Sequence, residues 1–186
     1  MAATSSSQLP LGTTAPAFTL PDVRLKGAPW TLGEQPSEAT VIVFMCNHCP
    51  YVVHVIDHMS QLFTELISRG VNVVGICSND AARYPDDAPE RMAEFANRHA
   101  WPSPYLHDES QAVAKAYQAA CTPEFFVLDR DLRVQYRGRY DEARPGNGAA
   151  VTGADLSRAV DCVLNGRAPD ADQIPSIGCS IKWKLD

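Results

Sequence analysis

Apolar and polar positions divide the chain into buried strands and amphipathic helices. Two apolar runs, residues 41–45 and 71–77, are each long enough for a strand that is buried on both faces. Between them, residues 51–68 carry apolar side chains at helical spacing, Val53 and Ile67 among them, with polar side chains opposite. Gly70 is placed to end this helix. Because a helix separates the two strands, we expect them to be parallel and joined by a right-handed crossover.

The rest of the chain adds further helices and an antiparallel pair of strands. Residues 124–129 and 134–140 have the pattern of two strands joined by a tight turn, which predicts a hairpin. The remaining expected elements are helices over 90–99, 110–119 and 152–164, a hairpin or edge strand within 13–32, and an extended piece at 105–107. This order predicts an α/β fold with a central mixed β-sheet and helices on both of its faces.

Length and composition suit one compact domain. The chain has 186 residues, 45% of them hydrophobic, and we place the domain at residues 12–186, after a serine-rich segment, 1–11, that we expect to be disordered. A net charge of −6 without any cluster of Lys or Arg argues against a nucleic-acid partner. The chain starts without a signal-like segment and has no apolar run of membrane-spanning length, so we expect a cytoplasmic protein with no membrane partner.

Cysteine chemistry is the strongest functional signal. The chain has six cysteines, which is too few for a chain of this size to depend on a disulfide framework. Two of them lie in the motif Cys46-Asn47-His48-Cys49-Pro50, where a buried strand passes into a helix. Free N–H groups at a helix N-terminus favour negative charge, so this position lowers the pKa of a thiol and makes its reactive thiolate available. The motif therefore predicts redox or metal chemistry.

Four segments together resemble the thioredoxin-like superfamily, and most closely its redoxin branch, which includes the AhpC/TSA-type thiol peroxidases. They are residues 15–22, the motif at 46–50, Cys121-Thr122-Pro123-Glu124-Phe125-Phe126, and the tail 178–184, which is similar to that of a bacterial group within this branch. The resemblance covers residues 12–186 and implies a thioredoxin-like fold with an N-terminal β extension and a C-terminal tail. It also implies a thiol–disulfide oxidoreductase that needs no cofactor, acts on disulfides or peroxides, and takes electrons from a cellular dithiol.

The resemblance also implies roles for individual residues. Thr122 and Pro123 correspond to the threonine and cis-proline pair that, in relatives, packs against the active-site cysteines and shapes the substrate site. A thioredoxin-like alignment makes Cys46 the nucleophile and Cys49 its resolving partner. Helix chemistry favours the opposite order, because Pro50 fits the first helical position and makes Cys49 the N-cap. Cys49-Pro50 also resembles the peroxidatic Cys-Pro of peroxiredoxins, although Cys46 then stands where those proteins have threonine.

Three further residues have two interpretations each. His48 either assists a thiolate or is an exposed loop histidine. Cys121 is either a third thiol at the site or a small buried residue, and Cys179 either folds back as a resolving cysteine or only packs. A different class of function also fits, because Cys46, Cys49, His48 and Cys121 are ligands suited to Cu(I) or Zn. We expect redox chemistry without a metal, and keep metal binding as the alternative.

Overall fold

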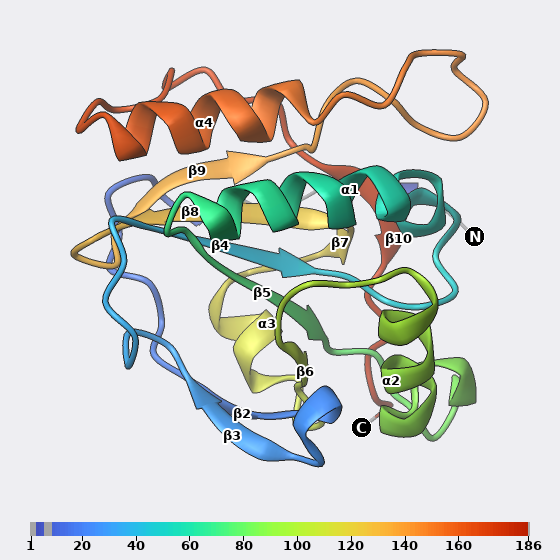
Figure 1. Ribbon diagram of the computed structural model, residues 1–186. Helices are drawn as coiled ribbons and strands as arrows, with labels where there is room; N and C mark the ends of the chain where they lie inside the picture. The colour runs from blue at the N-terminus through green and yellow to red at the C-terminus, as the bar shows by residue number, and fades with distance from the viewer. Residues whose placement is uncertain (1–2, 6–8, 186) are drawn as a thin grey trace.

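A mixed seven-stranded sheet organises the part of the chain that the computed structural model describes, residues 3–5 and 9–185 (Figure 1). Its spatial order is β3-β2-β6-β5-β4-β8-β9. The strands are β2 (Thr19–Asp22), β3 (Ala28–Thr31), β4 (Ala39–Phe44), β5 (Asn72–Cys77), β6 (Tyr105–His107), β8 (Glu124–Asp129) and β9 (Val134–Gly138). As predicted, β4 and β5 are parallel and β8 and β9 form an antiparallel hairpin.

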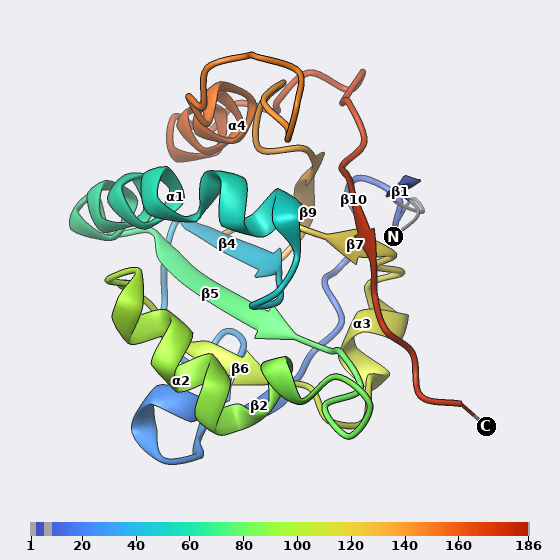
Figure 2. The same ribbon diagram turned by 90° about the vertical axis from the view of Figure 1, so that its right-hand side faces the viewer.

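Helices cover both faces of this sheet, which confirms the predicted fold class (Figure 2). On one face lie α1 (Pro50–Ser68), α2 (Pro89–Arg98) and α4 (Ala154–Leu164), and on the other lies α3 (Ala112–Ala116). Two short 3-10 helices, η1 (Val23–Leu25) and η2 (Pro85–Asp87), lie in connecting loops. Side chains alternate along β4, so that Val41 and Val43 enter one core cluster and Ile42 and Phe44 the other. No helix in the described part of the chain is long and apolar enough to cross a membrane.

Two helices differ in detail from the predictions. The apolar stripe of α1 is narrower than expected, because Val53 and Ile67 are exposed at its edges, at 50% and 38%. The sheet covers only the middle of the stripe, which includes Ile56 and Phe63. The helix α3 is shorter than the expected 110–119, because Gln118 has a positive φ of 54° and cannot continue a right-handed helix.

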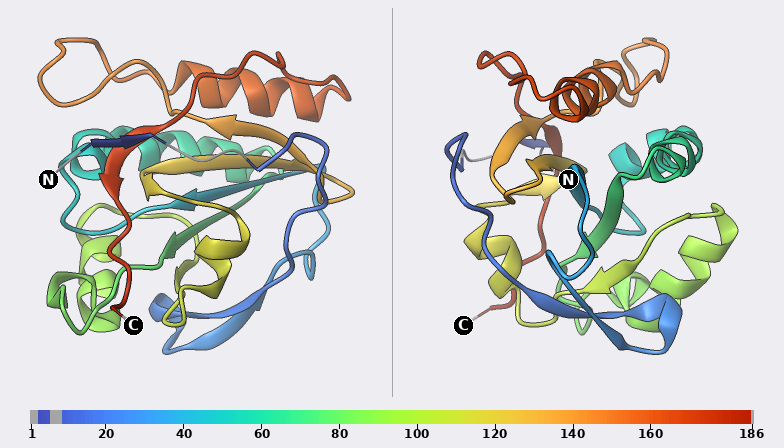
Figure 3. Two further views of the ribbon diagram at one scale, coloured as in Figure 1. Left: turned by 180° about the vertical axis from the view of Figure 1, so that it is seen from behind. Right: turned by 60° about the vertical axis from the view of Figure 1, so that its left-hand side comes forward.

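A second, three-stranded antiparallel sheet joins the two ends of the described chain, in the order β1-β10-β7 (Figure 3). Its strands are β1 (Ala3–Ser5), β10 (Ile177–Ser180) and β7 (Cys121–Thr122). We expected residues 1–11 to be disordered. Residues 1–2 and 6–8 lie outside the described residues, whereas Ala3–Ser5 pair with β10 and Leu9 is buried. The backbone N–H and C=O groups of Ala3–Ser5 thus find their partners along the edge of β10.

Candidate active site

The strand β4 and the helix α1 place two thiols at their junction. β4 ends at Phe44 and α1 begins at Pro50, so Cys46 and Cys49 lie in the short connection between them. Cys49 is the N-cap of α1, with Pro50 in the first turn, as the sequence predicted. Both side chains are fully enclosed, with exposures of 1% for Cys46 and 0% for Cys49. The chemistry of this pair therefore depends on the groups that surround it.

Cys49 is the more acidic of the two thiols. Its pKa is lowered to about 5, first by a hydrogen bond from the Cys46 thiol, against the opposing effect of burial. Hydrogen bonds from Cys179, from the Thr122 side chain and from the backbone of Val52 act in the same direction. One contact favours the protonated form, since the Cys49 thiol donates to the carbonyl oxygen of Thr122 at 3.1 Å. The donors outweigh this contact, so Cys49 has thiolate character near neutral pH.

Cys46 holds its proton instead. Its pKa is raised well above the usual value, first because its thiol donates to Cys49, and then by burial and by the negative charge of Asp87. Its Sγ atom lies 3.5 Å from the hydroxyl oxygen of Thr122. The two thiols are thus differentiated: Cys46 is the proton-bearing partner, and Cys49 carries the negative charge.

Thr122 contacts both sulfurs from β7, across the site from α1. The peptide bond between Thr122 and Pro123 is cis in the structure. The carbonyl of Thr122 faces Cys49 and its hydroxyl faces Cys46. The structure therefore brings together four of the residues singled out from the sequence, Cys46, Cys49, Thr122 and Pro123.

His48 is tied to a buried carboxylate and is not a free loop histidine. Its Nδ1 atom lies 2.9 Å from Oδ2 of Asp87, and its ring stacks on Tyr84 with ring centroids 5.8 Å apart. The hydrogen bond to Asp87 raises the pKa of His48, and burial opposes this effect only in part. The imidazole of His48 is therefore held by Asp87 beside the thiol of Cys46.

Asp87 is the residue of the candidate site that sequence reasoning missed. Its side chain is fully buried, and it accepts hydrogen bonds from the backbone N–H of Asn47 at 2.9 Å and from the side chain of Asn79 at 2.8 Å. In the sequence, Asp87 follows Asp86 in a polar loop with two prolines, which indicates only a solvated turn. The short helix η2 turns this one carboxylate inward, and no local pattern predicts that placement.

The two remaining cysteines of interest behave differently. Cys121 is buried at the edge of the site, where its Sγ atom lies 3.8 Å from Oε2 of Glu124 and burial raises its pKa. Cys179, in β10, lies opposite Thr122 in the strand register and hydrogen-bonds to Cys49. Burial and then this hydrogen bond raise the pKa of Cys179 to about 12. Cys179 is thus a direct neighbour of the acidic thiol, and Cys121 faces a carboxylate.

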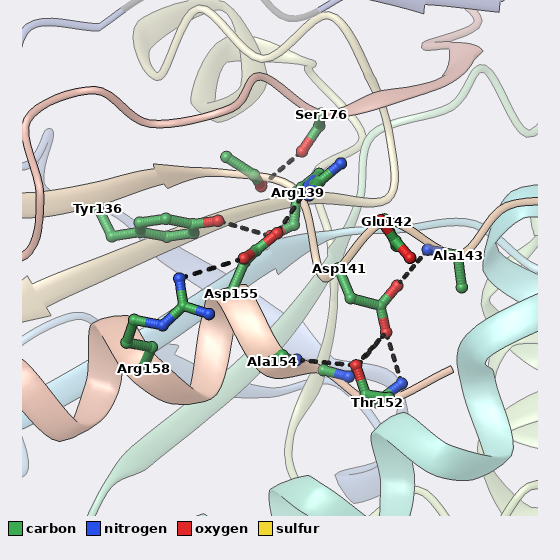
Figure 4. Close-up of polar contacts among 12 residues, drawn as sticks. Tyr136, Arg139, Asp141, Glu142, Ala143, Thr152, Ala154, Asp155, Arg158 and Ser176 are labelled. Carbon is green, nitrogen blue, oxygen red and sulfur yellow. Dashed lines mark hydrogen bonds and ion pairs between the residues drawn. The ribbon is translucent and has the colours of Figure 1, made fainter. Parts of the chain in front are cut away.

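Two hollows open beside the thiol pair. A polar hollow of about 260 Å³ is lined by Asn47, His48 and residues of α2. A second hollow, of about 150 Å³, is lined by Tyr51, Pro123 and the segment that follows β9. Figure 4 shows how that segment is held, with the carboxylate of Asp141 accepting hydrogen bonds from backbone N–H groups, including that of Thr152 at 2.6 Å. His48, which stands between the two cysteines, therefore lines the first hollow, and Pro123, next to Thr122, lines the second.

One group of residues has the donor set of a metal site. A sulfur, an imidazole nitrogen and a carboxylate oxygen, from Cys46, His48 and Asp87, all lie within 4.8 Å of one another. These atom types are typical ligands of zinc. The predicted set differed, since it had Cys49 and Cys121 in place of Asp87. Two features work against a metal here, because Cys46 holds its proton and the nitrogen of His48 already pairs with Asp87.

Comparison with known proteins adds a family match and close structural neighbours. The model of the AhpC/TSA family matches residues 11–137. An uncharacterized conserved protein from Geobacillus kaustophilus is 49% identical with a TM-score of 0.96, covering 100% of this chain and 98% of that one. A hypothetical protein from Sinorhizobium meliloti is 46% identical with a TM-score of 0.95, covering 98% of this chain and 100% of that one.

More distant structures confirm the predicted thioredoxin-like fold. The thioredoxin domain of a thiol–disulfide oxidoreductase from Bacteroides vulgatus is 17% identical, with a TM-score of 0.59 over 74% of this chain and 91% of that one. At this level of identity the likeness concerns the fold alone. No functionally curated relative matches the sequence.

Proposed function

The chain belongs to the AhpC/TSA family, and from this premise we propose that it is a thiol–disulfide oxidoreductase whose redox pair is Cys46 and Cys49. The observation that carries the proposal is that the pKa values of the two thiols are shifted in opposite directions. Cys49, at the N-cap of α1, has its pKa lowered to about 5, and the pKa of Cys46 is raised. A thiolate that is beside a protonated thiol is the arrangement that disulfide exchange requires.

The proposed reaction has two exchange steps. The Cys49 thiolate attacks one sulfur of a substrate disulfide, whose other sulfur leaves as a thiolate and takes up a proton. Cys46 then loses its proton and attacks the sulfur of Cys49, which expels the second substrate thiol and leaves a Cys46–Cys49 disulfide. A cellular dithiol reverses these steps and restores the reduced pair.

His48 and Asp87 would manage the proton of the second step. Cys46 must lose its proton at the moment it attacks, and side-chain atoms of His48 and Asp87 lie within 4.8 Å of its sulfur. A neutral His48 can accept that proton, and its ion pair with Asp87 stabilises the imidazolium that forms. Thr122 would hold both sulfurs in place, and Pro123 would line the hollow on the substrate side.

Family membership also supports a peroxidase variant of the same chemistry. In that variant Cys49 attacks a peroxide, one oxygen transfers to its sulfur as a sulfenic acid, and an alcohol or water leaves. The Cys46 thiol then condenses with the sulfenic acid to give the Cys46–Cys49 disulfide and water. The proposed partners are therefore protein or small-molecule disulfides or peroxides and a cellular dithiol, in a cytoplasmic location.

Metal binding is the second candidate function, favoured by the cluster of Cys46, His48 and Asp87. Purification without added metal, followed by measurement of bound zinc and copper, separates this function from redox exchange. Metal binding would be supported if the purified protein retains one metal ion per chain and the Asp87→Asn variant loses it. Redox exchange predicts no dependence on metal content.

Equilibration of the purified protein in glutathione buffers tests the redox proposal. Mass mapping of the products should find Cys46 and Cys49 joined at the oxidising end of the series and free at the reducing end. Cys162 is a matched control, because it lies on α4 at intermediate exposure, so Cys162→Ser should oxidise as the unaltered protein does. Finding Cys46 and Cys49 free in every buffer would refute the proposal.

A further inference from the structure

The C-terminal strand β10 is fitted closely against the cis-proline turn. β10 runs beside β7 (Figure 2), and the two strands pair antiparallel. Their register places Cys179 opposite Thr122. Gly178, the preceding residue, allows this approach, because a Cβ atom at that position would lie 2.0 Å from the carbonyl oxygen of Thr122. Any other residue would therefore force the two backbones apart, and glycine fixes β10 directly beside the thiol pair.

Cys49 is a neighbour of this strand. Its side chain is fully enclosed, and it accepts hydrogen bonds from the Cys179 thiol of β10 and from the Cys46 thiol of its own motif. Two thiols therefore hydrogen-bond to Cys49, one in its own motif and one in the tail. The Cys121 thiol feels the charge of Cys49 but faces Glu124. Cys77 hydrogen-bonds to Tyr105, and Cys162 is on α4.

We propose that Cys179 is a second resolving cysteine for Cys49, which competes with Cys46 and, when joined to Cys49, fastens β10 across the site. The proposal rests on the proposed function, because it needs Cys49 to be the attacking thiol. It extends that function from a two-cysteine to a three-cysteine mechanism. Cys49 would then form its disulfide either with Cys46 in its own motif or with Cys179 in the tail, and the bond could move between these two partners.

The proposed step is a thiol–disulfide exchange like the one between Cys46 and Cys49. When Cys49 carries a mixed disulfide with a substrate, Cys179 loses its proton and attacks the sulfur of Cys49. The bond to the substrate breaks, the substrate sulfur leaves as a thiol, and a Cys49–Cys179 disulfide forms. Two protein thiols are oxidised and one substrate disulfide is reduced to two thiols.

Cys179 becomes easier to deprotonate at the moment when it is needed. Two of the three influences that raise its pKa are its hydrogen bond to Cys49 and the negative charge of Cys49. Both disappear once Cys49 is bonded to a substrate sulfur and no longer carries charge. The positive charge of Lys182, three residues along, continues to lower the pKa.

The test uses the full chain and a small disulfide, cystamine. In Cys46→Ser, Cys49 should first take up cysteamine and then release it as the Cys49–Cys179 disulfide forms, detected by mass mapping. In the double variant Cys46→Ser with Cys179→Ser, the cysteamine adduct should persist, with release slowed by about tenfold or more. Cys46→Ser with Cys162→Ser is the matched control and should release cysteamine as Cys46→Ser does.

Each outcome decides between the two proposals. A persistent adduct on Cys49 with Cys179 free overturns the role of Cys179 and leaves the Cys46–Cys49 mechanism intact. If Cys49 takes up no cysteamine in any variant and forms no disulfide in the unaltered protein, both the proposed function and the role of Cys179 are overturned.

A second variant keeps every cysteine and serves if Cys46→Ser folds poorly. Gly178→Ala should push β10 away from Thr122, so limited oxidation should yield the Cys46–Cys49 disulfide alone. The unaltered protein should yield a mixture that includes Cys49–Cys179. Finding Cys49–Cys179 equally in both proteins, or in neither, would overturn the proposal.

Discussion

The Nδ1 atom of His48 and the Oδ2 atom of Asp87 lie 2.9 Å apart, and this pair stands beside the thiol of Cys46. His48 comes from the motif between β4 and α1, and Asp87 comes from η2, far along the chain. The carboxylate is fully buried and is held from two further directions by Asn47 and Asn79. Burying a charge is costly unless it is paired and hydrogen-bonded, and these partners together offset that cost for Asp87.

His48→Gln should destabilise the protein more near pH 6 than near pH 9. The pKa of His48 is raised in the folded state, so the ion pair with Asp87 contributes its full stability below the unfolded value of about 6.5 and loses it as pH rises through the folded value. We expect a loss on the order of 1 kcal/mol at the lower pH. Urea unfolding at both pH values measures it, and an equal loss at both would show that the imidazolium makes no contribution.

Cys49 should react faster than Cys46 with a small alkylating agent at about pH 6. Cys49 has its pKa lowered to about 5 and Cys46 has its pKa raised, and only the thiolate reacts. The measurement compares Cys46→Ser, which retains Cys49, with Cys49→Ser, which retains Cys46, with each site followed by mass mapping. Faster alkylation of the retained Cys46 would mean that Cys46 is the nucleophile, as the thioredoxin-like alignment implies.

The reduced protein should lose stability relative to Cys49→Ser as pH falls toward 5. A thiol whose folded pKa is depressed contributes stability that is fully present above its unfolded pKa, about 8.5, and is lost as pH falls through the folded value of about 5. Chemical unfolding of the two reduced proteins across this range measures the difference. A difference that does not change with pH would indicate that Cys49 is not deprotonated in the folded state.

Gly178→Ala should loosen β10 and lower stability by about 1–3 kcal/mol, because the added Cβ would overlap the Thr122 carbonyl. Hydrogen exchange at Ile177–Ser180 should become faster while exchange in β4 is unchanged. Gly146→Ala is the matched control, because Gly146 has a positive φ of 84° but open space around its Cβ position. Gly146→Ala should lower stability through backbone strain, and it should leave hydrogen exchange in β10 unchanged. Equal protection of β10 in all three proteins would contradict the close fit at Gly178.

The fold could be predicted because its signals are local and repeated. The apolar runs of β4 and β5 and the periodicity of α1 each follow from neighbouring residues. The position of Cys49 as the N-cap also followed from a local rule, the preference of proline for the first helical turn. The exposed Val53 and Ile67 show the limit of that approach, because how much of an apolar stripe is covered depends on the width of the facing surface.

The residues of the site that the sequence did not predict depend on contacts between segments that are distant along the chain. Asp87 lies in a loop that has no apolar pattern, and its inward turn follows from partners on two other loops. Gly178 looks like an ordinary turn residue until the Thr122 carbonyl is seen next to it. Local sequence patterns contain residue types and their spacing, and they do not contain the tertiary distances that make these two residues matter.

The place of β10 in the chain has a consequence for biosynthesis. β10 is the last strand of the described chain, and its Cys179 hydrogen-bonds to Cys49. A growing polypeptide therefore completes β4, α1 and the Cys46–Cys49 motif before it completes this contact. Until β10 has emerged and docked, Cys49 of a nascent chain lacks one of the hydrogen bonds that lower its pKa, so the thiol becomes fully acidic only after the last strand has been made.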